Sequence, residues 1–194
     1  MANKPNMGLI VLISIVAVLL IVVLWFVGSY NGLIRVDAEV DESWANVQTQ
    51  YQRRADLIPN LIEVVKESAS FQQETFIEVT KLRSQWQSAK ASGTRQEQFQ
   101  IGQSMGSALS KLLVTVENYP DLDLDTFKDL QAQLEGTENR VSVARQRFNE
   151  KVKIFNVKIK RIPTVIIANM LGYTQEQFFE SKPGTEEVPV VDFG

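Results

Sequence analysis

The sequence contains neither cysteine nor histidine among its 194 residues. Without cysteine, it offers no disulfide framework, no thiolate metal site and no residue that a lipoprotein signal could acylate. Without histidine, it lacks the commonest metal ligand and the commonest general base at neutral pH. These absences remove the usual routes to acid–base and metal-assisted catalysis. We therefore expect a protein that is not an enzyme and that has no cofactor, no metal site and no catalytic residues.

Positive charge is also scarce, because 20 Lys and Arg stand against 23 Asp and Glu, which gives a net charge of −3. A nucleic-acid interface needs a basic face that neutralises phosphates, so this balance argues against DNA or RNA as a partner. No glycine-rich phosphate loop, nucleophile elbow or metalloprotease signature occurs in the sequence. No small-molecule substrate is therefore expected.

Charge is absent altogether from residues 8–27, where 15 of the 20 residues are Val, Ile or Leu. A helix of this length spans about 30 Å, which is the thickness of the hydrocarbon core of a bilayer. Its aliphatic residues favour insertion by about 7 kcal/mol in total. Trp25, Phe26 and Tyr30 follow the apolar run, where an aromatic belt is expected. The sequence therefore predicts a transmembrane helix at residues 8–28 after a short flank at residues 1–7.

A cleaved signal peptide is the competing interpretation of this segment. Signal peptides have an apolar region of about 7–15 residues that ends in a small-x-small site. Here the run is longer and only Val27-Gly28-Ser29 follows it, which favours an uncleaved anchor. The orientation stays open, because Lys4 and the α-amino group precede the span and Arg35 alone follows it closely.

Beyond the span, apolar residues recur at spacings of three and four, which predicts amphipathic helices. The first continues from the span to Pro59, which is expected to end or bend it. The second covers Leu61–Trp86 and is followed by a predicted loop at residues 88–96. The third covers residues 101–116, and the fourth covers residues 127–162.

The end of the chain carries its own signals. The stretch Lys151–Ile154 alternates, so a strand is conceivable there, but the length of the fourth run favours a helix. Pro163 is expected to open a short fifth helix and Gly172 to end it, with a flexible tail at residues 181–194. The predicted fold is all-α: an up-and-down four-helix bundle over residues 29–180 with a short extra C-terminal helix.

Several motifs in this sequence are distinctive in order and spacing. Tyr30-Asn31-x-Leu33 follows the span, and Arg53–Leu61 reads Arg-Arg-Ala-Asp-Leu-Ile-Pro-Asn-Leu. Further motifs are Glu117–Leu122, Glu138–Arg145, the pairs Phe148-Asn149 and Phe155-Asn156, and Pro163 with Ala168, Gly172 and Tyr173. From Tyr30 to Phe193, the chain resembles the LemA family of bacterial membrane proteins.

The resemblance departs from the family pattern in two places. The two Phe-Asn pairs usually carry Tyr, and Glu67–Glu74 replaces a usual segment that contains a histidine. The resemblance implies a single-span protein of the bacterial inner membrane whose soluble part is an up-and-down four-helix bundle, and magnetosome-associated relatives suggest a membrane-organising role. It implies a helical scaffold or interaction protein of an uncharacterised process, with a protein partner or with self-association at the membrane. The alternative is an accessory subunit of a membrane signalling protein or membrane protease.

Polar residues of these motifs form the first candidate site. Glu138 and Arg145 are seven residues apart and fall on the apolar face of the fourth helix, so they are expected to pair this helix with the first one. The alternative is a pocket for a partner or ligand. Acid–base work by Glu135 and Glu138 is not expected, because such pairs usually lie on a solvated face. The candidate network comprises Arg53, Arg54, Asp56, Asn60, Glu117, Glu138, Arg145 and Asn149.

A basic cluster beside the apolar stretch Ile162–Leu171 forms the second candidate site. Cations near the C-terminus of a long helix oppose the negative end of its dipole, which is the simpler explanation. The alternative is contact with anionic lipid headgroups near the anchor. The candidate lipid-headgroup patch comprises Lys151, Lys153, Lys158, Lys160 and Arg161.

Overall fold

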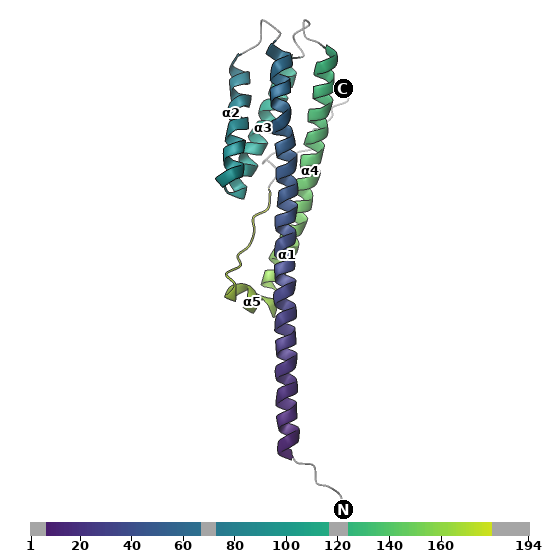
Figure 1. The fold of residues 1–194 in the computed structure, drawn as a ribbon, viewed down its shortest axis with the longest axis vertical. Coiled ribbons are helices and arrows are strands. Elements are labelled where there is room, and N and C mark those ends of the chain that lie inside the picture. Colours follow the sequence, from purple (N-terminus) through teal and green to yellow (C-terminus); the bar gives the residue numbers. More distant parts are fainter. Residues whose placement is uncertain (1–6, 67–72, 117–123, 180–194) are drawn as a thin grey trace, which may run out of the picture. The chain divides into compact units, whose positions relative to one another are not determined.

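The computed structural model describes residues 7–66, 73–116 and 124–179, and all regular elements within these ranges are helices. They are α1 (Met7–Lys66), α2 (Gln73–Ser92), α3 (Arg95–Val116), α4 (Leu124–Lys160) and α5 (Thr164–Met170), and Figure 1 follows them along the chain. The all-α prediction is confirmed. The strand considered at Lys151–Ile154 is wrong, because these residues lie inside α4.

Helix α1 begins with the apolar run and has 60 residues. It is the single helix in the described ranges that is long and apolar enough to cross a membrane. The side chains of residues 7–28 are all exposed, whereas Leu33, Val36 and Val40 further along are buried. One helix therefore supplies both the apolar stretch and part of a packed core.

Pro59 was expected to end or bend the first helix, and it does not end it, because α1 continues to Lys66. Proline removes one backbone N–H and crowds the preceding turn, which costs roughly 3 kcal/mol inside a helix. Ile58 and Leu61 on either side of Pro59 are both fully buried. Burial of such a side chain contributes about 1.5–3 kcal/mol, so the two flanking contacts offset the cost of the proline.

The predicted loop at residues 88–96 is also wrong in its extent. Helix α2 runs to Ser92 and α3 starts at Arg95, which leaves Gly93 and Thr94 as the connection. Thr94 and Glu97 form a capping box. The Thr94 backbone N–H donates to Glu97 Oε2 at 2.8 Å, and the Glu97 N–H donates to Thr94 Oγ1 at 3.2 Å. This reciprocal pair satisfies free N–H groups at the start of α3 and fixes where the helix begins.

The prediction for the last helix is nearly right. Helix α5 begins at Thr164, and Pro163 occupies the preceding cap position rather than the first helical one. Gly172 follows the helix with φ of +73°, a conformation that glycine adopts without the steric cost of a Cβ. The expected stop at Gly172 is therefore confirmed. The tail at residues 181–194 and the motif residue Glu117 lie outside the described residues.

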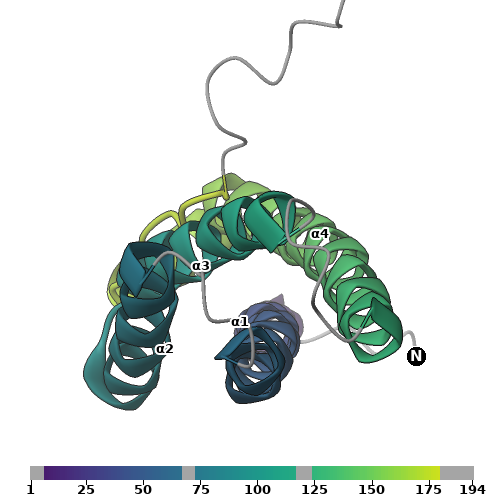
Figure 2. The same cartoon turned by 90° about the horizontal axis from the view of Figure 1, so that it is seen from above.

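The chain divides into two compact units. Unit 1 comprises Met1–Glu42 with Glu150–Phe178, and unit 2 comprises Ser43–Asn149 with Phe179–Gly194. Within unit 2, Figure 2 shows α2, α3 and α4 in an arc with α1 on its inner side. The side chains of α1 contact all three of these helices, as described below.

Unit 1 is held together by α1, the end of α4 and α5. Lys151 Nζ donates to Glu39 Oε2 at 2.9 Å, and Lys158 Nζ donates to the Gly32 carbonyl oxygen. From the first pair to the second, the residue number falls by seven on α1 and rises by seven on α4. The two segments are therefore antiparallel. The buried apolar side chains of this unit are Leu33, Val36, Val40, Val152, Phe155, Ile159, Ile167 and Ala168.

Candidate functional site

Two large side chains from α1 extend into the interior of unit 2. Tyr51 and Arg54 lie one turn apart on α1, and both are almost fully buried. Opposite them, α3 carries Gly102 and Gly106, which are also one turn apart. A Cβ on Gly102 would lie 2.5 Å from the Tyr51 ring, and one on Gly106 would lie 2.6 Å from Arg54 Nη1. The two glycines therefore provide the space that Tyr51 and Arg54 occupy.

Arg54 links α1 to α4. Its Nη2 forms an ion pair with Glu138 Oε2, and its Nε donates to Thr137 Oγ1 at 3.5 Å. Burial lowers the pKa of the Arg54 guanidinium, and the attraction of Glu138 opposes this shift. The guanidinium nevertheless stays charged at neutral pH, because an arginine side chain is not deprotonated in proteins. The carboxylate of Glu138 is largely exposed, so the pair joins a buried cation to an anion at the surface.

Tyr51 makes the second link between α1 and α4. Arg145 donates to the Tyr51 hydroxyl oxygen from Nε at 2.9 Å and from Nη2 at 2.6 Å. The Arg145 guanidinium also lies 4.9 Å from the centre of the Phe99 ring, and the Tyr51 ring meets Trp86 edge-on at 5.1 Å. Burial raises the pKa of the Tyr51 phenol, so it remains neutral at physiological pH. Through these contacts Tyr51 touches α2, α3 and α4.

Asn149 has a different partner, the segment that follows α5. Its side-chain amide donates to the Phe179 carbonyl at 2.9 Å and accepts from the Phe179 N–H at 2.9 Å. The Phe179 ring stacks on Phe99 and Phe148 at centroid distances of 4.4 and 4.6 Å. Asn156 holds the Glu176 backbone in the same way within unit 1, at 2.8 and 2.9 Å. Each Phe-Asn motif thus contributes a buried ring and a clamp on the backbone.

The structure divides the predicted polar network into separate groups. Arg54 meets Glu138, Arg145 meets Tyr51, and Asn149 meets the Phe179 backbone. Arg53 and Asn60 are exposed, and the exposed Asp56 accepts a hydrogen bond from Gln52, one turn earlier on α1, at 2.7 Å. The seven of these residues that the structure describes therefore do not form one continuous network, although two of the groups join α1 to α4.

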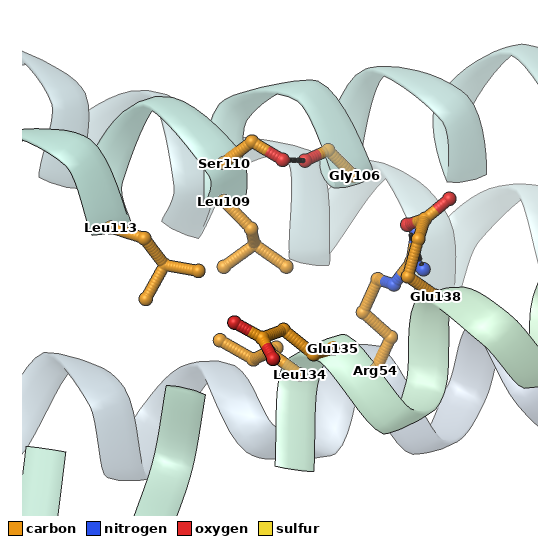
Figure 3. A pocket seen from close by; sticks show the side chains of 8 residues that line it. All are labelled: Arg54, Gly106, Leu109, Ser110, Leu113, Leu134, Glu135 and Glu138. Atoms are coloured by element: carbon orange, nitrogen blue, oxygen red, sulfur yellow. Dashed lines mark hydrogen bonds and ion pairs between the residues drawn. The ribbon is translucent and has the colours of Figure 1, made fainter. Parts of the chain in front are cut away.

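A cavity of about 130 Å³ lies beside Arg54, between α1, α3 and α4. Figure 3 shows Leu109 and Leu113 on one side of it and Leu134 beside Glu135 on the other, with the Arg54–Glu138 pair drawn. Ser110 is the hydroxyl group in the lining, and it donates to the Gly106 carbonyl at 3.0 Å. Ser110 therefore donates its proton to a backbone carbonyl and not to a carboxylate of the lining that could act as its base. The cavity is lined by Arg54, Gly106, Leu109, Ser110, Leu113, Leu134, Glu135 and Glu138.

The basic cluster is also divided by its contacts. Lys151 is paired with Glu39, which raises the pKa of the lysine and lowers the pKa of the carboxyl. Lys158 is held by the Gly32 carbonyl and is half-buried. Lys153, Lys160 and Arg161 are exposed.

Sequence reasoning missed residues that complete these contacts. The close packing at Gly102 and Gly106 could have been predicted, because small residues four apart on a helix permit close approach of a neighbour. The hydrogen bonds of Thr137 and Tyr51 could not be predicted from their local sequence, since they depend on the neighbouring helices. Phe179 lay within the predicted domain but was not proposed as a core residue, although two adjacent aromatics in a polar stretch are conspicuous.

Comparison with known proteins shows the family to which the chain belongs. The sequence pattern that defines the LemA family matches residues 43–193. The chain belongs to the LemA family. Similar proteins include magnetosome protein MamQ 1 and magnetosome protein MamQ 2 of Paramagnetospirillum magneticum, each 23% identical over 84% of this chain and 68% of its own length. Magnetosome protein MamQ of Magnetospirillum gryphiswaldense is 24% identical with the same coverage.

Membership of this family and the exposed apolar part of α1 together identify a membrane-associated protein. Within the family motif Arg53–Leu61, Arg54 is the buried residue that pairs with another helix, and Ile58 and Leu61 are core residues.

Proposed function

We propose that this LemA-family protein is a membrane-anchored helical scaffold that has no catalytic activity and that self-associates at the membrane. Residues 8–28 of α1 span the bacterial inner membrane once. Helices α1 to α4 form an up-and-down four-helix bundle, and α5 is appended to it. The observation that carries the proposal is α1, which continues from an exposed apolar stretch into residues that pack in the core.

The contacts inside unit 2 support a role in holding helices together rather than in chemistry. Arg54 pairs with Glu138, and Arg145 donates hydrogen bonds to the Tyr51 hydroxyl. The hydroxyl of Ser110 donates to a carbonyl of its own helix. Buried polar contacts of this kind fix which helices pair and in which register. The relatives named as magnetosome proteins support a role in organising a membrane.

Self-association is tested by light scattering on the full-length protein after size exclusion in a mild detergent, with the detergent mass subtracted. We expect a protein mass that is a multiple of the 21.9 kDa chain. A strict monomer at all concentrations would contradict self-association. A stoichiometric signalling protein or protease that co-purifies from native membranes would favour the accessory-subunit alternative.

A further inference from the structure

The corner between α4 and α5 lies beside the end of the apolar stretch of α1. Glu39 and Gly32 on α1 are paired with Lys151 and Lys158 on α4. Two residues further, where α4 ends, the same antiparallel register places Lys160 opposite Tyr30, two residues past the end of the predicted span. Figure 1 shows α5 at this end of α4. The corner therefore lies at the level where α1 would leave the hydrocarbon core.

This corner exposes large apolar side chains. Ile166 and Met170 lie one turn apart on α5, so they share one face of this helix, and they are 59% and 71% exposed. Ile162 lies between α4 and α5 and is 85% exposed. On the other side of α5, Ile167 and Ala168 are buried, so the helix is held against the rest of unit 1. Large apolar side chains that are exposed together mark a contact surface.

In unit 1 the charged side chains nearest to the span are positive, and the negative ones lie further away. Residues 7–36 and 154–171 carry four charged side chains, and all four are positive: Arg35, Lys158, Lys160 and Arg161. The acidic side chains begin further from the span, at Asp37 on α1 and at Glu150 on α4. Glu176 is also further away, because its backbone is clamped to Asn156, six residues before Ile162.

We propose that the corner formed by residues 158–171, which we name the foot, rests on the bilayer that α1 spans. Ile162, Ile166 and Met170 enter the boundary between headgroups and acyl chains, and Lys160 and Arg161 contact the phosphates of anionic lipids. Tyr30 on α1 lies opposite Lys160 in this register, and Trp25 and Phe26 lie about one turn nearer to the span, where interfacial aromatics are expected. The proposal rests on the membrane anchoring of α1 proposed above.

The foot contains only some of the residues of the lipid-headgroup patch that the sequence predicts. Lys151 is engaged by Glu39 and lies eleven residues before Ile162, so it is outside the foot. Lys153 is nine residues before Ile162, about 13 Å away along a helix. The apolar stretch Ile162–Leu171 lies beside the basic cluster in the sequence. In this proposal its exposed side chains are the part of the foot that enters the membrane.

The absence of native cysteine allows a direct test with single spin labels on the full chain. Ile166→Cys and Met170→Cys place a label on the foot, and Glu150→Cys places an exposed control on α4 about 18 Å further from the span. The labelled proteins are reconstituted in vesicles of phosphatidylcholine with phosphatidylglycerol. Collision with oxygen, which partitions into lipid, is compared with collision with a water-soluble nickel chelate.

We expect oxygen to relax the labels at positions 166 and 170 more strongly than the nickel chelate does, with the reverse order at position 150. The same water exposure at all three positions would overturn the foot. Sedimentation of the vesicles after carbonate washing is the separate check on anchoring. Protein that stays in the vesicles with a water-exposed foot contradicts the foot alone, whereas protein lost to the wash contradicts the proposed anchor.

The role of charge is tested by the double substitution Lys160→Glu with Arg161→Glu in the Ile166→Cys background. We expect the label to lose oxygen contact and gain nickel contact in vesicles that contain phosphatidylglycerol. The control is Lys81→Glu with Lys128→Glu, which makes the same charge change at exposed positions in unit 2 and should leave the label where it is. An unchanged label in the Lys160 and Arg161 variant would overturn the contact with anionic headgroups.

Discussion

Gly102→Ala should lower the free energy of unfolding by about 2 kcal/mol, although alanine favours helices more than glycine does. The new Cβ would lie 2.5 Å from the ring of Tyr51, which is fully buried between Trp86 and Arg145. Because the ring is held by both neighbours, it has little freedom to retreat, and overpacking of this kind costs roughly 1–3 kcal/mol. Thermal unfolding followed by circular dichroism would measure the change.

Gly136→Ala is the matched control, because Gly136 also lies inside a helix. A Cβ there would meet only the end of Arg140, at an ordinary contact distance of 3.5 Å. With no clash, the higher helix propensity of alanine should stabilise the protein by about 0.5–1 kcal/mol. If both substitutions stabilised the protein equally, the close packing of Tyr51 against α3 would be wrong.

Glu138→Ala should destabilise the protein by about 2 kcal/mol even though the Glu138 side chain is 61% exposed. The substitution leaves the buried guanidinium of Arg54 without its carboxylate, and uncompensated buried charge is costly. The value stays below that of a fully buried pair because solvent screens the exposed side of the interaction. Chemical denaturation of each variant, monitored by tryptophan fluorescence, would give the difference.

Two further variants separate this charge effect from other causes. Glu135→Ala changes an exposed carboxylate that lines the same cavity, and it should stay within about 0.5 kcal/mol of the parent. Adding Arg54→Met to Glu138→Ala should restore most of the lost stability, because the buried charge is then replaced by an apolar chain of similar length. Failure of the second substitution to restore stability would show that the loss came from elsewhere.

Helix type and the apolar faces could be predicted from the sequence, because burial follows the spacing of three and four residues. Leu33, Val36, Val40, Trp44 and Val47 illustrate this, since all of them are buried in α1 as their spacing predicts. The end of the first helix could not be predicted from Pro59 alone. Whether the helix continues past Pro59 depends on how much the burial of Ile58 and Leu61 stabilises it, and the residues around Pro59 do not show this by themselves.

The candidate site was predictable in part. Glu138 and Arg145, which the spacing placed on the apolar face, and Arg54 of the candidate network do lie where helices meet. Their partners were not predictable, because Arg145 pairs with the hydroxyl of Tyr51 and Asn149 pairs with a backbone that returns from beyond α5. Such contacts are set by how the chain folds back and leave no pattern at a fixed spacing.

The single-span anchor is tested most directly by two cysteine variants of the full chain, Ala2→Cys and Ser88→Cys. Ser88 is exposed on α2, so a label there should be tolerated. Each variant is expressed in cells and treated with a membrane-impermeant maleimide before and after lysis. If α1 spans the membrane once, one of the two positions is labelled before lysis and the other only after it, and the result also shows which side holds the helical domain. Three results would contradict the anchor. Both positions could be labelled before lysis, neither could be labelled before lysis, or the Ala2→Cys position could be lost by cleavage.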